Sequence, residues 1–274
     1  MCAPFVIETV RRNLSRRQFV GAVAAGAVSA PRPASAQQPA LRLPKGFRAV
    51  VDLTHVHSPA LPVYPGYKPM QVRPRTTIAQ NGYANNEVTF DEHTGTHVDA
   101  PSHFVTGAVS ADRLPVDRLI APLVVVSIAD RASKDADTLV SVDDLLQWEK
   151  QHGRIPAGAL VAMRSGWDAR IGDVDRFLNR DAKGTLHAPG FGEPAARFLV
   201  TERDIGGVGV DTLSLDASAA QKFVAHVAIL GAGKYGVEML ANLGRVPAAG
   251  ATVIVGAPKH IGATGGPARV LALV

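Results

Sequence analysis

Short runs of aliphatic and β-branched residues recur along the chain and alternate with segments of helical spacing. The apolar runs predict buried strands at residues 49–53, 123–128, 159–164, 207–211 and 251–255. Helical spacing predicts helices at residues 142–152, 193–200 and 237–243, the first of them with Ser141 as its N-cap. Strands that alternate with helices indicate an α/β or α+β class, although this pattern does not specify the order of the strands.

The first 36 residues differ in character from the rest of the chain. Two arginine pairs precede an apolar run of small residues, Phe19 to Ala30, and Ala34-Ser35-Ala36 offers a cleavage site. Residues 15–20, SRRQFV, resemble the bacterial twin-arginine signal. We therefore expect residues 1–36 to be a twin-arginine-type signal peptide, and residues 37–274 to be one domain exported to the periplasm.

Composition and charge exclude several classes of protein. The chain is 46% hydrophobic and has one cysteine, Cys2, so it can build a sizeable core but no disulfide framework. The formal net charge is +5, but the first 36 residues hold five arginines and one acid, which leaves only +1 for the rest. Nucleic-acid binding is therefore not expected. The apolar run at the start is too short to span a membrane, and no longer one follows it.

One segment, residues 93–103 (HTGTHVDAPSH), combines three of the nine histidines with an aspartate. Imidazole and carboxylate together suit a divalent metal such as zinc, manganese or iron. In an extended chain His97 and Asp99 point to the same side, and a sharp turn at Gly95 can bring His93 to the same ion. Pro101 argues against a continuous helix. A polar loop with satisfied histidines is the alternative, which this density of ligand types disfavours.

Further ligands would have to come from other parts of the chain. Asp91 and Glu92 precede the segment, but they would crowd it or are simply solvated. His226 and Glu238 flank a glycine-rich turn and could converge if that turn folds back. From spacing alone, His226 could equally be a core or capping histidine. His187 precedes a Pro-Gly turn and is a candidate pocket residue, with a loop role as the alternative.

The histidine segment resembles the signature HxGTHxDxPxH of the cyclase and kynurenine formamidase family. Shorter family elements are similar to residues 63–66, 187–191 and 209–216, and His226 and Glu238 match the spacing of the family's distal metal ligands. The resemblance implies a metal-dependent hydrolase with a swivelling β/β/α fold in a single domain. It also implies a homodimer or tetramer. Asp211 and Asp216 are interpreted as structural turn residues rather than ligands.

The same resemblance implies a role for each candidate site residue. One metal would be held by His93, His97 and Asp99, and a second would be held or bridged by Asp99, His226 and Glu238. One or two zinc or manganese ions per chain are therefore expected. The role of acid/base residue falls to His103.

Three further residues are candidates for substrate binding. Tyr64 stands where formamidases usually place a tryptophan, which keeps an aromatic wall but argues against formylkynurenine as the substrate. Trp167 follows a predicted strand and either contributes to the pocket or packs inside the fold. His187 is the third candidate.

The reaction expected from these parts is hydrolysis of an amide, a lactam or an ester in a small molecule, by a metal-activated water. The chain has no G-x-S-x-G element and no cysteine after residue 36 to serve as a nucleophile. Two alternatives within hydrolases are a mononuclear manganese enzyme of the isatin hydrolase kind and a lactone-opening enzyme. An alternative of another class is a periplasmic metal- or ligand-binding protein without activity.

A dinucleotide-binding enzyme is not expected, although residues 231–236 (GAGKYG) match G-x-G-x-x-G. The fingerprint needs an acidic residue about 20 positions further on to bind the ribose. No Asp or Glu follows Glu238.

Overall fold

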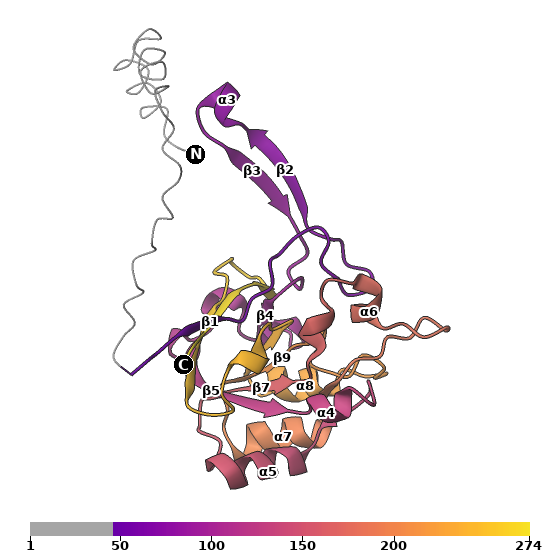
Figure 1. The fold of residues 1–274 in the computed structure, drawn as a ribbon. Helices are drawn as coiled ribbons and strands as arrows, with labels where there is room; N and C mark the ends of the chain where they lie inside the picture. The colour runs from indigo at the N-terminus through magenta and orange to yellow at the C-terminus, as the bar shows by residue number, and fades with distance from the viewer. Residues whose placement is uncertain (1–45) are drawn as a thin grey trace, which may run out of the picture. The chain divides into compact units, whose positions relative to one another are not determined.

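The computed structural model describes residues 46–274, so the predicted signal peptide lies outside the described residues. Within these residues, nine strands form one mixed sheet in the order β1-β13-β11-β5-β7-β9-β10-β4-β12 (Figure 1). Its centre consists of four parallel strands: β5 (Ile120–Ser127), β7 (Leu160–Arg164), β9 (Gly207–Val210) and β10 (Tyr235–Glu238). The predicted α/β class is confirmed.

Antiparallel strands extend this centre on both sides. One side carries β11 (Ala251–Gly256), β13 (Arg269–Leu273) and β1 (Val50–Asp52). The other side carries β4 (His97–Asp99), which pairs with β10, and β12 (Gly265–Pro267), which pairs with β4. The sheet thereby places a segment near the C-terminus directly beside the histidine segment.

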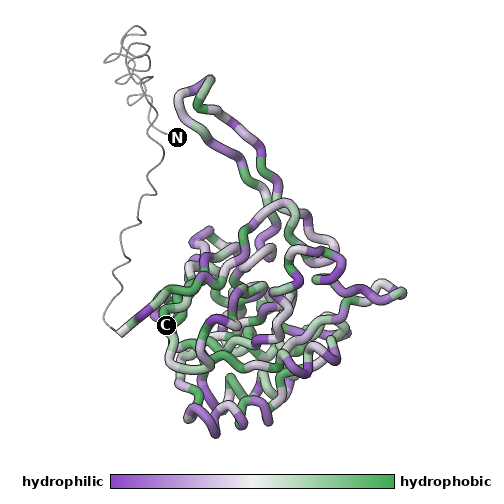
Figure 2. Tube along the Cα trace, in the orientation of Figure 1, coloured by the Kyte–Doolittle hydropathy of each residue, from purple (hydrophilic) through white to green (hydrophobic). Residues whose placement is uncertain are grey.

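The central strands are buried on both faces, which explains why they are continuous apolar runs rather than alternating ones. In β5, Leu123 and Val125 belong to one hydrophobic core, while Val124 and Val126 belong to a second. Buried residues of α5 (Val142–His152), α7 (Glu193–Glu202) and α8 (Val224–Gly231) pack into this second core. Figure 2 shows the contrast between the hydrophobic strands and the hydrophilic outer turns of α5.

Short elements connect these parts. Two short strands, β6 and β8, pair with each other in parallel. The bounds are β6 (Leu139–Val140), β8 (Gly190–Phe191), α4 (Ala129–Ala132), α6 (Val174–Leu178), η1 (Pro101–His103), η2 (Ala111–Arg113), η3 (Val116–Arg118), η4 (Trp167–Arg170) and η5 (Leu243–Arg245). None of the helices in residues 46–274 is both long and apolar enough to cross a membrane.

A separate hairpin stands away from the sheet (Figure 1). It consists of β2 (Gln71–Thr76), α3 (Ile78–Asn81) and β3 (Asn85–Thr89), and nearly all of its residues are exposed. The hydrophobic pattern does not predict these strands, because a hairpin that buries neither face shows no regular alternation of apolar and polar positions.

The predicted strands correspond to β1, β5, β7, β9 and β11, and two of the three predicted helices correspond to α5 and α7. The helix predicted at 237–243 is wrong. Strand β10 occupies its first residues, Met239 then has a φ of 52°, and η5 begins only at Leu243. Hydrogen bonds to β9 and β4 on both sides satisfy the backbone of β10, so pairing within the sheet overrides a spacing that also suits a helix.

Candidate metal centre

The pairing of β4 with β10 brings one imidazole and two carboxylates to one face of the sheet. His97 and Asp99 are two residues apart in β4, so both project from the same face, as predicted. Glu238 lies directly opposite His97 in the antiparallel register. The distances from His97 Nε2 are 3.3 Å to Asp99 Oδ1 and 3.4 Å to Glu238 Oε2.

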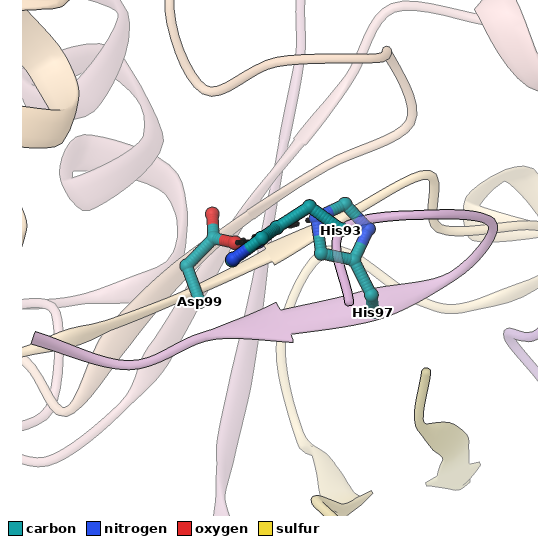
Figure 3. A group of neighbouring side chains, drawn as sticks. All are labelled: His93, His97 and Asp99. Carbon is teal, nitrogen blue, oxygen red and sulfur yellow. Dashed lines mark hydrogen bonds and ion pairs between the residues drawn. The ribbon is translucent and has the colours of Figure 1, made fainter. Parts of the chain in front are cut away.

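A turn before β4 brings His93 to the same place. Gly95 has a φ of 64°, in the left-handed region, and a Cβ atom on it would lie 3.3 Å from both the His57 ring and Leu61. Glycine is therefore favoured here by conformation, and a larger residue would also press against these two side chains. Across the turn, His93 Nδ1 lies 2.6 Å from Asp99 Oδ1, and Figure 3 shows the ring directed at that carboxylate.

Helix α8 supplies the fifth side chain, His226. His226 Nε2 lies 3.1 Å from Glu238 Oε1 and 3.6 Å from Asp99 Oδ2. The glycine-rich turn between α8 and β10 does fold back, and Gly233 adopts a φ of 70° within it. The GAGKYG run thus leads from a helix into a strand, the reverse of the strand-to-helix order that a dinucleotide fingerprint needs.

The five side chains form two overlapping groups that share Asp99. In each group one donor atom per residue lies within 4.8 Å of the others: His93, His97 and Asp99 make the first group, and Asp99, His226 and Glu238 the second. These are the two ligand sets that the family resemblance implies, and the structure brings all five residues together.

The far ring nitrogens of two of these histidines are held by acceptors behind them. His97 Nδ1 lies 2.8 Å from the Gly95 carbonyl oxygen, and His226 Nδ1 lies 2.6 Å from Asp216 Oδ2. Asp216 also accepts a hydrogen bond from the backbone N–H of Ala225. Both imidazoles therefore direct Nε2 at the cluster, and Asp216 orients a histidine, in line with its interpretation as a structural residue.

The electrostatics of the cluster favour a cation. Burial lowers the pKa of His97, but the adjacent carboxylates of Asp99 and Glu238 outweigh this effect and raise it to about 10. Burial raises the pKa of Asp99, yet the adjacent imidazoles of His226, His93 and His97 bring it well below its ordinary value. The two carboxylates thus stay ionised and hold a positive charge beside them.

Two buried polar atoms of the cluster test whether a metal fits. Among residues 46–274, His97 Nε2 and Asp99 Oδ2 are buried and have no hydrogen-bond partner. Such orphaned groups are costly inside a protein, and an ion held between them would satisfy both. Imidazole nitrogen and carboxylate oxygen are also the donors that zinc and manganese accept. The residues present therefore fit a divalent metal.

His103 lies beside the cluster at the end of η1. Its ring stacks on that of His93, with 3.8 Å between centroids and an interplanar angle of 22°. Burial lowers the pKa of His103 to about 4, against the opposing charge of Asp99. The imidazole is therefore neutral at pH 7 and can accept a proton.

An aromatic cavity of about 190 Å³ opens onto the cluster. Tyr64, a candidate for substrate binding, lines it, and so do aromatic residues that the sequence analysis missed: Tyr67, Phe104 and Phe223. The ring of Phe104 stacks on His226 at 4.7 Å, and Phe223 stands edge-on to Phe104 at 5.5 Å. Two of the missed residues are close in sequence to predicted ones: Tyr67 is three positions after Tyr64, and Phe104 is directly after His103.

The structure does not bring Trp167 or His187 to this cavity. Trp167 is only 1% exposed and donates its indole N–H to the Phe177 carbonyl oxygen at 2.8 Å, so the alternative of a packed strand end holds. His187 lies near the surface, with Nδ1 2.8 Å from Asp137. Both residues were placed by closeness to turns and strand ends in the sequence, which does not show the direction of a side chain.

Glu92 also departs from expectation. Its side chain is half-buried and accepts hydrogen bonds from the backbone N–H and the hydroxyl of Thr264, at 2.9 and 2.6 Å. Asp91, by contrast, is bonded at the surface to the backbone N–H of Lys68. The position of Glu92 next to His93 was the available signal, but its partner is far away in the sequence.

Comparison with known proteins places the chain in a family. The family model "Cyclase: Putative cyclase" matches residues 51–217. The chain is 39% identical over 200 residues to isatin hydrolase of Roseibium aggregatum, which covers 70% of this chain and 75% of that protein. It is 25% identical over 225 residues to kynurenine formamidase of Salinibacter ruber, covering 81% and 96% of the two chains.

A solved structure agrees with these sequence matches. Isatin hydrolase A from Ralstonia solanacearum superposes with a TM-score of 0.78 and 36% identity, over 82% of this chain and 92% of the other. The likeness therefore extends over most of both chains. The chain belongs to the cyclase family, and it is a metal-dependent hydrolase.

Proposed function

We propose that this protein hydrolyses a C–N bond in a small aromatic amide, in particular the lactam ring of an isatin-like substrate. The observation that carries the proposal is the aromatic cavity, which is lined by His93, His226 and Glu238 of the five clustered side chains and by the neutral His103. The relative with 39% identity is named isatin hydrolase, which supports a cyclic substrate over an open-chain formamide.

Each group of residues has its own role in this proposal. The metal would be held by His93, His97, Asp99, His226 and Glu238. When bound, a divalent ion supplies a Lewis acid that polarises the substrate carbonyl and lowers the pKa of the attacking water. The cavity walls orient the substrate, because Tyr64, Tyr67, Phe104 and Phe223 offer flat faces against which a planar ring stacks.

His103 is proposed to move the proton. In its neutral form it can take a proton from the attacking water and return it to the leaving nitrogen. Its stacking on His93 keeps the imidazole beside the cluster during both transfers. The surrounding aromatic side chains limit access of bulk water to the reacting atoms.

The experiment that tests this function measures the disappearance of isatin absorbance with the metal-loaded protein, with and without a strong chelator. Formylkynurenine and an aromatic lactone are the comparison substrates. Chelator-sensitive opening of isatin, at least about tenfold faster than cleavage of the other two, is the expected result. Faster cleavage of formylkynurenine or of the lactone would contradict the lactam assignment. Metal binding without turnover of any of them would favour a non-catalytic binding protein.

The metal itself is proposed to be zinc or manganese, one or two per chain, since the two ligand groups share Asp99. Mass spectrometry of the untagged protein, purified without added metal, measures both identity and number. About two ions per chain would support a bridged pair. About one ion per chain would mean that the second group, with His226 and Glu238, does not hold an ion of its own.

We further propose that two copies associate through the hairpin of β2, α3 and β3. A lone two-stranded hairpin is marginally stable in water, and this one exposes Val72, Val88, Ile78 and Tyr83. A second copy that covers it would bury this apolar surface. Light scattering on the Val72→Asp/Val88→Asp double variant should show a monomer where the parent protein is a dimer or tetramer.

Export through the twin-arginine pathway is proposed from residues 1–36 alone. The support is the arginine pair followed by a short apolar run and a small-residue cleavage site. Fusion of these residues to a reporter protein, compared with the Arg16→Lys/Arg17→Lys variant, tests the proposal. The variant should keep the reporter in the cytoplasm.

A further inference from the structure

The third histidine of the cluster has a different support behind it. His93 Nε2 lies 2.9 Å from the hydroxyl oxygen of Thr264, and that oxygen lies 2.6 Å from Glu92 Oε2. The backbone N–H of Thr264 also donates to Glu92 Oε2, at 2.9 Å. The proposed reaction uses neither Thr264 nor Glu92, yet the two form a continuous chain of hydrogen bonds that ends on a metal ligand.

The chemistry of the three groups fixes the direction of these hydrogen bonds. A carboxylate can only accept, so the single hydroxyl proton of Thr264 is donated to Glu92. The hydroxyl oxygen can then only accept from His93, so Nε2 carries the ring proton. In the neutral ring, the form that can bind a cation, Nδ1 then carries the lone pair, and this atom lies 2.6 Å from Asp99 Oδ1.

We propose that Glu92 and Thr264 are positioning residues of the metal site, which hold His93 in the tautomer that binds metal through Nδ1. The opposite tautomer would place a proton on Nδ1, where it would exclude a cation. The other two histidines each have their tautomer fixed by a single acceptor: the Gly95 carbonyl oxygen for His97, and Asp216 for His226. His93 requires two residues, because a hydroxyl alone could either donate or accept.

The backbone around Thr264 is fixed to the strand that carries the ligands. The Thr264 carbonyl oxygen accepts from the Ala100 N–H at 2.8 Å, and Gly265 pairs directly with Asp99. A Cβ atom on Gly265 would lie 2.6 Å from Cε1 of His93, so the imidazole rests against bare backbone. Hydroxyl, imidazole and carboxylate are thus held in register by the pairing of β12 with β4.

The test compares Thr264→Val, which removes the hydroxyl at nearly constant shape, with Thr264→Ser, which keeps it. Affinity of the full chain for Zn²⁺ and Mn²⁺ is measured by competition with a chromophoric chelator, and the melting temperature is measured without metal. We expect Thr264→Val to bind metal about 10–100-fold more weakly, as for other residues that orient a metal ligand, and Thr264→Ser to bind within about threefold of the parent.

A second pair of variants covers the case in which Thr264→Val does not fold. Glu92→Gln removes the group that can only accept, because a glutamine amide can donate to the hydroxyl and allow it to donate to Nε2. Asp91→Asn, the neighbouring change of charge at the surface, is its matched control. Glu92→Gln should weaken metal binding, and Asp91→Asn should leave it unchanged.

His93→Ala separates this inference from the ligand set on which it rests. In the His93→Ala background, Thr264→Val should cause no further loss of metal affinity. An equal loss there, or equal affinities for Thr264→Val and Thr264→Ser, would overturn the positioning role alone. If His93→Ala itself binds metal as tightly as the parent, the proposed ligand set fails and the inference fails with it.

Discussion

Two histidine–carboxylate clusters in this protein have similar distances but different surroundings. In the buried cluster, His93, His97 and Asp99 meet at 2.6 to 3.3 Å. At the surface, His187 lies 2.8 Å from Asp137 and 3.6 Å from Asp181. Short distances between these residue types therefore do not by themselves distinguish a metal centre from an ordinary ion pair.

Burial and the supporting hydrogen bonds make the difference. The side chains of His97 and Asp99 are at most 2% exposed and include polar atoms without partners, whereas water reaches all three side chains of the surface cluster. Each histidine of the buried cluster also has its far nitrogen committed to an acceptor. The buried groups need a cation to offset their desolvation, and the surface groups do not.

The largest expected effect comes from breaking the buried cluster. His97→Ala removes the imidazole that lies between Asp99 and Glu238, and leaves the two carboxylates facing each other. Metal affinity and hydrolysis should both fall by more than about a hundredfold, since even residues that merely orient ligands contribute about 10–100-fold. Metal titration and initial rates measure the two losses. Normal metal binding by this variant would remove His97 from the ligand set.

A smaller effect, confined to turnover, is expected at the edge of the buried cluster. His103→Ala should keep the metal but lower kcat by about 10²–10⁴-fold, the usual contribution of a general acid/base group. Metal content and kcat are measured on the same sample. The exposed His152→Ala is the matched control and should be unchanged in both. Full activity of His103→Ala would refute the acid/base assignment.

The surface cluster should give the smallest effect, and one that depends on pH. The hydrogen bond to Asp137 and its charge, with help from Asp181, raise the pKa of His187. A group whose pKa is raised on folding stabilises the protein below its ordinary pKa, and this contribution is lost as the pH rises through the raised value.

His187→Gln should therefore lower the melting temperature by at most a few degrees below about pH 6, and by less at about pH 8. Metal content and hydrolysis should not change, because His187 does not line the cavity. Thermal melts at several pH values, with metal analysis of the same samples, make the measurement. A loss of bound metal would mean that the two clusters are coupled, and that the surface cluster is not independent of the metal centre.

Part of this architecture is local in origin, and the sequence predicts it. The central strands are continuous apolar runs, and α5 begins at Ser141, which forms a capping box with Asp144. The extended spacing of His97 and Asp99 and the turn at Gly95 concern residues within a few positions of each other. Such features follow from backbone periodicity and glycine conformation, so a pattern of residue types is sufficient to find them.

The rest depends on contacts between distant parts of the chain. Residues 237 and 238 lie in a strand because β9 and β4 pair with it on both sides. Trp167 is buried and donates its indole N–H to a carbonyl ten residues away. Thr264 lies 171 positions from His93, and no periodicity links them. The sequence by itself determined which residues could bind a metal. Only the tertiary structure decided which partners bury, orient and surround them, because pairing partners and burial arise when the sheet assembles.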